Sequence, residues 1–300
     1  MPVSPSRYEL LQKRLDRFTQ LLPGVGKGDE RALHRTRVAS RRLRELLPVL
    51  QLEGKVAGEL GRRLRKVIQR LGRIRELDVT LMLVEELKTA GDYGVDALER
   101  VGSAIRQERE RAREELLAKW PAREIRRVGS RLADLADTLE TSDNERSQAV
   151  TRGLRWAVDA RIHRRGSELK AAIEDAGAVY LPERLHAVRI ALKKFRYAVE
   201  LASEIASDRR LLADLRLLKR NQDLLGRWHD RQVLIERARQ VQASLTPPSA
   251  SGVRRLDRLV TMLENDCRRL HARYIRESAA IVAVCDRMGL RVPGAARRAS

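Results

Sequence analysis

Residues 33–44, LHRTRVASRRLR, recur as residues 185–196, LHAVRIALKKFR, without an insertion or a deletion. A second match follows at nearly the same offset, because residues 71–76, LGRIRE, correspond to residues 225–230, LGRWHD. Two matches at almost one offset indicate an internal repeat, in which one structural unit occurs twice. The chain is therefore predicted to contain two related halves.

Apolar residues recur every three or four positions along nearly the whole chain, which is typical of amphipathic helices. The pattern predicts helices near residues 5–22, 30–52, 56–89, 93–119, 122–140, 145–176, 183–206, 208–243 and 251–288, with the first break at Pro23–Gly26. We expect an all-α fold of two four-helix bundles, related by the duplication and a pseudo-twofold axis. Repeat one spans 5–119, a linker helix spans 122–140, repeat two spans 145–288, and the tail 293–300 is expected to be disordered.

The charge balance indicates a polyanionic partner. The chain has 62 Lys and Arg residues against 41 Asp and Glu, which gives a formal net charge of +21. Such an excess favours binding to nucleic acid, an anionic membrane or inorganic polyphosphate. Aromatic residues make up only 3% of the chain, so it has little material for the stacking platforms of single-stranded nucleic-acid binders.

The first copy of the motif places its basic residues on one face of a helix. At about 100° per residue, Arg37, Arg41 and Arg44 fall within roughly 80° of His34. The second copy puts His186, Arg189, Lys193 and Arg196 on one arc in the same way. Like charges stacked along a helix repel one another, so a stripe without interleaved acids indicates an external anion.

A further basic face is predicted on the following helix of each half. Its residues are Arg62, Arg65, Lys66 and Arg73 in the first half and Arg216, Lys219, Arg220 and Arg227 in the second. Acidic residues lie near both faces, so these cations have two open interpretations. They contact the anion, or they pair internally.

The residue types suit phosphate. Arg offers a planar fork of N–H donors, Lys a point charge, and His one donor when neutral and two when protonated. A single His on a helix is more often a packing residue, and His163 and His271 are interpreted in that way. His34 and His186 differ because each precedes the same ladder of cations.

Other chemistries find no support in the sequence. No Cys/His cluster has zinc spacing, and no Gly-rich loop follows a strand. The dipeptide His229-Asp230 lacks the further ligands of a metal phosphohydrolase. We therefore expect no metal, no cofactor and no enzymatic activity.

The sequence also favours a cytoplasmic location. It has no apolar signal core at its start and no apolar stretch near the roughly 20 residues of a membrane span. Its two cysteines, Cys267 and Cys285, lie too far apart in one helix to bridge, which favours a reducing compartment. No membrane partner is expected.

The paired motifs resemble the CHAD domain, the conserved histidine α-helical domain, over roughly residues 5–288. The resemblance implies two four-helix bundles around a basic central surface that binds inorganic polyphosphate, and association with polyphosphate granules and their proteins. It implies that this surface is lined by His34, Arg37, Arg41, Arg44, His186, Arg189, Lys193 and Arg196. No segment has the Glu-x-Glu-x-Lys strand of a CYTH domain, so a stand-alone copy without triphosphatase activity is expected.

The sequence thus predicts a polyphosphate-binding protein, with two alternatives left open. One is a sequence-independent binder of the nucleic-acid backbone, and the other is an enzyme acting on polyphosphate or nucleotides. The complete predicted site consists of His34, Arg37, Arg41, Arg42, Arg44, Arg62, Arg65, Lys66, Arg73, His186, Arg189, Lys193, Lys194, Arg196, Arg216, Lys219, Arg220 and Arg227.

Overall fold

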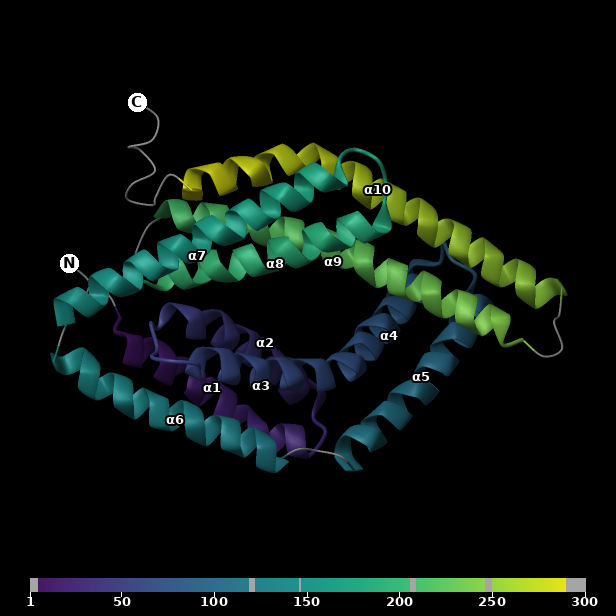
Figure 1. Cartoon of the computed structure of the whole chain (residues 1–300). Coiled ribbons are helices and arrows are strands. Elements are labelled where there is room, and N and C mark those ends of the chain that lie inside the picture. The colour runs from purple at the N-terminus through teal and green to yellow at the C-terminus, as the bar shows by residue number, and fades with distance from the viewer. Residues whose placement is uncertain (1–4, 119–121, 146, 206–208, 246–249, 290–300) are drawn as a thin grey trace. The chain divides into compact units, whose positions relative to one another are not determined.

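The computed structural model describes residues 5–118, 122–145, 147–205, 209–245 and 250–289. Helices are the only regular secondary structure in these ranges, which confirms the all-α prediction. In chain order they are α1 (Arg7–Gly26), α2 (Glu30–Leu46), the 3-10 turn η1 (Leu47–Val49), α3 (Val56–Arg70), α4 (Gly72–Ala90), α5 (Val95–Ala118), α6 (Ala122–Glu145), α7 (Ser147–Ala176), α8 (Pro182–Ile205), α9 (Arg209–Ala243) and α10 (Ala250–Gly289) (Figure 1).

The helices form two compact units. Unit 1 comprises residues 1–71, 120–220 and 278–300, and unit 2 comprises residues 72–119 and 221–277. Each unit contains helices from both predicted repeats, since unit 1 includes α1–α3 with α7 and α8, and unit 2 includes α4 and α5 with parts of α9 and α10. The compact units and the predicted repeats are thus different divisions of the chain, and the duplication stays a prediction. The predicted disordered tail, 293–300, lies outside the described residues.

Unit 1 brings both copies of the motif into one helical assembly. Within it, α1 packs against α2 and α6, α2 packs against α3 and α8, and α7 packs against α8. Its core contains fully buried aromatic side chains from distant segments, such as Phe18 on α1 and Phe195 on α8. A buried ion pair between Arg7 and Asp143, 2.7 Å apart, joins α1 to α6. The contact between α2 and α8 matters most here, because these helices carry the two motifs.

Unit 2 is built on α4, α5 and the adjoining parts of α9 and α10. Trp228 on α9 is 2% exposed and anchors its core. Asp266 on α10 accepts hydrogen bonds from the Tyr93 hydroxyl and from Nε of Arg231, the latter at 3.0 Å. Burial and this hydrogen bond raise the pKa of Tyr93 to about 12, so its hydroxyl stays protonated and acts as a donor.

Three predicted helix boundaries are wrong, and a local reason accounts for two of them. The break predicted at Pro23–Gly26 is absent, since α1 continues to Gly26 and the chain turns at Gly28, whose φ is +74°. The helix predicted over 30–52 leaves the α conformation at Leu46, because Pro48 cannot donate a helical hydrogen bond. The helix predicted over 56–89 is interrupted at Leu71. The apolar spacing continues across that residue, so the sequence pattern contains no sign of the interruption.

Candidate anion-binding site

Helix α2 begins with a side-chain cap and turns its motif outward. Asp29 accepts a hydrogen bond from the backbone N–H of Ala32 at 2.6 Å, which satisfies one of the open donors of the first turn. The buried face of α2 contains Leu33, Ala39 and Leu43. The opposite face leaves His34 exposed and the side chains of Arg37, Arg41 and Arg44 half-buried. The predicted stripe is therefore present on one face.

Helix α8 repeats this arrangement with the second copy. Pro182 and Glu183 occupy its first turn, where a proline and a negative charge suit a helix start. Its buried side chains include Leu185, Val188 and Phe195. The predicted binding residues of α8 are all half-buried, and they are His186, Arg189, Lys193, Lys194 and Arg196.

Four guanidinium groups from three helices of unit 1 form what we call the arginine cluster: Arg41 and Arg44 on α2, Arg65 on α3 and Arg165 on α7. Burial lowers the pKa of Arg44, and the positive charges of Arg65, Arg41 and Arg165 lower it further, against the opposing effect of Glu45. A cluster of like charges is unfavourable until an anion compensates it. Arg165 already pairs with Glu45 and Glu168, so the charges left for a negatively charged ligand are those of Arg41, Arg44 and Arg65.

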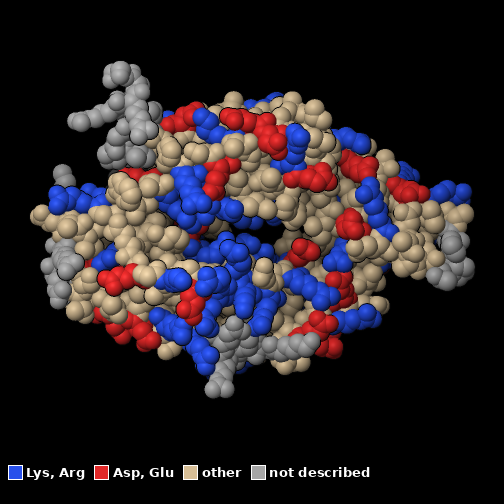
Figure 2. Space-filling view, in the orientation of Figure 1, with Lys and Arg blue, Asp and Glu red and all other residues tan. Residues whose placement is uncertain are grey.

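Helix α3 passes Arg44 at Gly61, with room left there for a side-chain carbon. A Cβ atom at Gly61 would lie 4.0 Å from Cγ of Arg44. The exposed residues Arg62, Arg65 and Lys66 form no ion pair with any carboxylate in the part of the chain that the structure describes. In that part, these three cations remain available to a ligand. Figure 2 shows Lys and Arg side chains gathered over the α2–α3 region of unit 1.

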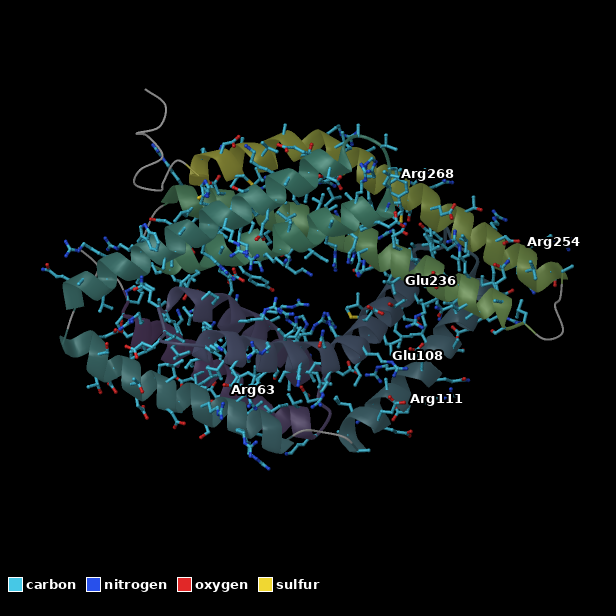
Figure 3. All side chains as sticks on the ribbon, in the orientation of Figure 1. Arg63, Glu108, Arg111, Glu236, Arg254 and Arg268 are labelled. Carbon is cyan, nitrogen blue, oxygen red and sulfur yellow. The ribbon has the colours of Figure 1, made fainter. Side chains whose placement is uncertain are left out.

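The other side of α3 is neutralised. Arg63 pairs with Glu59 at 2.9 Å, and Arg131 of α6 pairs with the same carboxylate at 2.5 Å (Figure 3). Arg63 was not among the predicted binding residues. The basic face of α3 is thus confined to the side that faces α2.

Helix α7 contributes cations that the sequence analysis missed. Glu45, which is 6% exposed, accepts hydrogen bonds from Nε of Arg161 at 2.7 Å and Nε of Arg165 at 3.4 Å. Burial alone would lower the pKa of Arg165, but hydrogen bonds and charge from Glu168 and Glu45 raise it. The i, i+4 spacing of these two arginines was the available signal in the sequence. The first half of the chain has no matching pair, so the comparison of the repeats did not single these arginines out.

Several predicted residues of α8 and α9 lie elsewhere in unit 1. Arg196 donates a hydrogen bond to Glu200 at 3.2 Å and stacks over the ring of Tyr197 at 4.5 Å. Burial, together with the charges of Arg189 and Lys193, lowers the pKa of His186. On α9, the predicted residues of unit 1 have exposed side chains, and they are Arg216, Lys219 and Arg220.

Two predicted residues, Arg73 and Arg227, belong to unit 2. Arg73 pairs internally with Glu108 at 3.5 Å and Glu115 at 3.2 Å, both on α5 (Figure 3). Glu108 also pairs with Arg237 at 2.6 Å. For Arg73 the structure therefore shows the internal pairing that the sequence left open. The Arg227 side chain is exposed, and its carbonyl accepts a hydrogen bond from Arg231.

Two kinds of feature are absent from the described residues. They contain no group of three or more His, Cys, Asp or Glu side chains arranged to hold a metal ion. Within the same ranges, no helix is both long enough and apolar enough to cross a membrane.

Comparison with known proteins places these features in a family. The model of the CHAD domain matches residues 9–239. Two solved structures have a similar fold. PptA from Streptomyces chartreusis is 19% identical, with a TM-score of 0.65 over 92% of this chain and 100% of that chain. The CHAD domain from the plant Ricinus communis is 20% identical, with a TM-score of 0.59 over 98% of this chain and 95% of that chain. No curated protein matches the sequence.

Proposed function

Because this chain belongs to the CHAD domain family, we propose that it binds inorganic polyphosphate through the basic face of unit 1. This face consists of the arginine cluster, the exposed cations of α3 and the motif residues of α2 and α8. The residues themselves select a polyanion, and the choice of polyphosphate follows from the family resemblance.

The observation that carries the proposal is the arginine cluster around Arg44. Its charges are close enough to lower the pKa of Arg44, yet Arg41, Arg44 and Arg65 form no ion pair with a carboxylate of the described ranges. A phosphate oxygen that bridges two of these guanidinium groups would relieve their repulsion and accept charge-assisted hydrogen bonds. The guanidinium groups repel one another in the free protein, and in the complex each of them attracts the phosphate.

A linear chain of phosphates fits this surface chemically. Every unit of the polymer presents the same oxygens, so neighbouring cations on α2, α3 and α8 can each engage successive units without reading a base. Nothing among the described residues of the face provides an aromatic platform on the scale that single-stranded nucleic-acid binders use. These features favour polyphosphate over nucleic acid.

A titration with long-chain polyphosphate and with duplex DNA at two salt concentrations tests the proposal. Charge reversal of Arg37 together with Arg189, one residue from each motif, is expected to abolish polyphosphate binding. The matched control reverses two exposed charges on α6, Arg126 and Arg127. Unchanged affinity in R37E/R189E, or displacement of polyphosphate by DNA at moderate salt, would contradict the proposal.

We also propose that the site binds its polymer without cleaving it, and that binding recruits the protein to polyphosphate granules. Incubation of the purified protein with polyphosphate and Mg²⁺ should release no phosphate above the level of a heat-inactivated sample. A fluorescent fusion should colocalise with granules, and the R37E/R189E fusion should be diffuse. Phosphate release that the double variant abolishes would instead identify an enzyme.

A further inference from the structure

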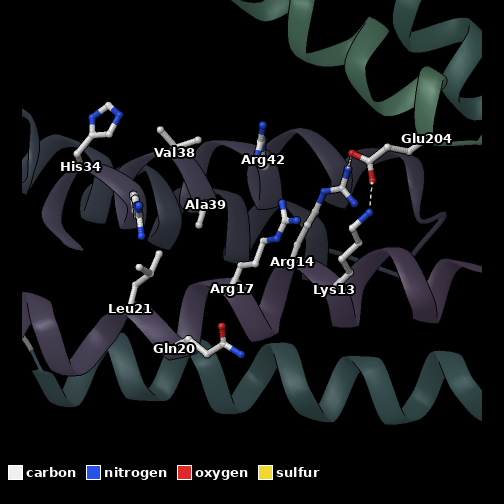
Figure 4. A pocket seen from close by; sticks show the side chains of 11 residues that line it. Lys13, Arg14, Arg17, Gln20, Leu21, His34, Val38, Ala39, Arg42 and Glu204 are labelled. Atoms are coloured by element: carbon white, nitrogen blue, oxygen red, sulfur yellow. Dashed lines mark hydrogen bonds and ion pairs between the residues drawn. The ribbon is translucent and has the colours of Figure 1, made fainter. Parts of the chain in front are cut away.

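A groove of about 480 Å³ lies between α1 and α2 in unit 1, and Glu204 of α8 contributes to one end of it (Figure 4). This volume lies in the range of small-molecule binding sites. The groove differs in composition from the arginine cluster. Most of the cations occupy the end near Glu204, apolar side chains follow, and His34 lies at the other end. Arg35, the next residue in the sequence, also lines the groove.

The cationic end contains buried donors without acceptors. Arg14 is 6% exposed, and it donates from Nη1 to the carbonyl of Leu10 and from Nη2 to Glu204, both at 3.0 Å. Its Nε is buried and has no hydrogen-bond partner in the described part of the chain, and the same holds for Nε of Arg42. Both atoms are shielded from solvent, so neither contacts a ligand in the groove, but their guanidinium groups still place positive charge at this end.

The charges at this end reinforce that conclusion. Burial has the largest effect on the pKa of Arg14 and lowers it. The charges of Arg42 and Arg17 lower this pKa further, whereas those of Glu204 and Glu200 raise it. Arg17 is exposed and forms no ion pair within the described residues. The three guanidinium groups therefore form a small anion site. Arg17 is its accessible member, and Arg14 and Arg42 are more buried.

The middle of the groove has a different character. Leu21, Val38 and Ala39 line it, and they offer nothing to a phosphate oxygen. A ligand made only of phosphates would leave this apolar wall in contact with water. A ligand with an organic body next to its phosphate would cover the wall and gain binding free energy from the apolar surface that it buries.

Glu204 adds a further requirement. Its carboxylate accepts from Arg14 at 3.0 Å and lies 3.6 Å from Nζ of Lys13, and a carboxylate has lone pairs for more donors. A negative charge beside the groove repels a ligand that is anionic along its whole length.

We propose that this groove binds a nucleoside phosphate, at a site that adjoins the polyphosphate-binding face and shares His34 and Arg42 with it. Arg14, Arg17 and Arg42 supply the positive charge that holds the phosphate group, and Leu21 and Val38 pack against the nucleoside. The planar ring of His34 lies at the end where a base can stack on it.

Isothermal titration of the full chain with ATP, inorganic tripolyphosphate and ribose 5-phosphate tests the site. ATP is expected to bind at least about tenfold more tightly than tripolyphosphate, because only ATP covers the apolar wall. R17E should weaken ATP by about tenfold or more, since it removes a charge-assisted contact. ATP affinity equal to that of tripolyphosphate would overturn the proposal.

A second variant separates shape from charge. V38R fills the groove while adding a positive charge, so it should abolish ATP binding without weakening long-chain polyphosphate. R65E, in the arginine cluster, should do the reverse and leave ATP affinity within about twofold. ATP binding by V38R at the wild-type level would contradict the nucleotide site. Polyphosphate affinity is measured separately for each variant. Failure of the proposed polyphosphate binding can therefore be distinguished from failure of the nucleotide site.

Discussion

Glu200 on α8 accepts a hydrogen bond from Arg42 on α2 and so joins the two helices that carry the repeated motif. Arg196, on α8 itself, donates to the other oxygen of the same carboxylate at 3.2 Å. One acid thus receives a guanidinium group from each copy of the motif. It fixes the contact between α2 and α8, and it neutralises part of the charge that a polyanion would meet.

The first prediction concerns this carboxylate. E200Q keeps an oxygen that accepts a hydrogen bond but removes the negative charge beside Arg42 and Arg196. We expect polyphosphate to bind roughly threefold to tenfold more tightly at low salt, since the local potential becomes more positive. The free energy of unfolding should fall by only about 1 kcal/mol, because the ion pair between Arg42 and Glu200 is partly exposed. Fluorescence titration at two salt concentrations measures the affinity.

The control for E200Q is E183Q on the exposed first turn of the same helix. It changes the net charge equally and should alter the affinity far less. An equal gain in both variants would mean that net charge decides binding, and that the Glu200 carboxylate has no particular role.

The second prediction concerns the arginine cluster. R65E places an acid beside Arg44, where it pairs with that guanidinium group and removes two cations from the surface. The logarithm of the affinity should then fall less steeply with the logarithm of salt concentration, by about 0.7–0.9 for each phosphate that the protein no longer neutralises, by analogy with nucleic acids. R127E on α6 changes the net charge equally and should leave the salt slope near that of the wild type. A slope unchanged by R65E would exclude Arg65 from the contact.

The third prediction concerns stability. Arg7 pairs with Asp143 at 2.7 Å, and it also donates to the carbonyl of Leu50 at 3.1 Å. R7M leaves a carboxylate buried without its partner, so urea unfolding should show a loss of about 3–5 kcal/mol. R7M/D143M removes both charges and should recover part of that loss. If the double variant is less stable than R7M, the buried charge is not the cause.

The repeated motif allowed the sequence to predict the basic faces of α2 and α8. A helical wheel separates Leu43 from Arg41 and Arg44 by angle alone, and burial in the structure follows that separation. The wheel cannot show which other helix approaches a face. Arg65 and Arg165 lie near Arg44 because of the way α3 and α7 pack. The ion pair between Glu45 and Arg165 depends on the same packing.

Local sequence also failed where packing decides the backbone. The chain from Leu64 to Leu77 keeps a helical apolar spacing, yet the helix is interrupted at Leu71. The corresponding segment, LGRWHD, lies within the continuous helix α9. Two segments with the same local pattern thus differ in structure, so tertiary contacts, not propensity, determine where these helices are interrupted.

The last prediction concerns the effect of pH through His186. Burial and the charges of Arg189 and Lys193 lower its pKa, so the imidazole of the free protein is neutral near pH 7. A bound polyanion compensates these cations and raises that pKa, so binding takes up a proton and the affinity increases as the pH falls below about 6.5. Stability of the free protein changes in the opposite direction. The unfolded chain binds the proton more readily than the folded one, so the contribution of His186 is complete above about pH 6.5 and is lost as the pH falls toward its folded pKa. H186Q should remove both effects, whereas H163Q, an exposed histidine on α7, should preserve them. Titrations and urea unfolding at pH 7.5 and 5.5 measure the two quantities, and a pH dependence of affinity that persists in H186Q would assign the proton to another group.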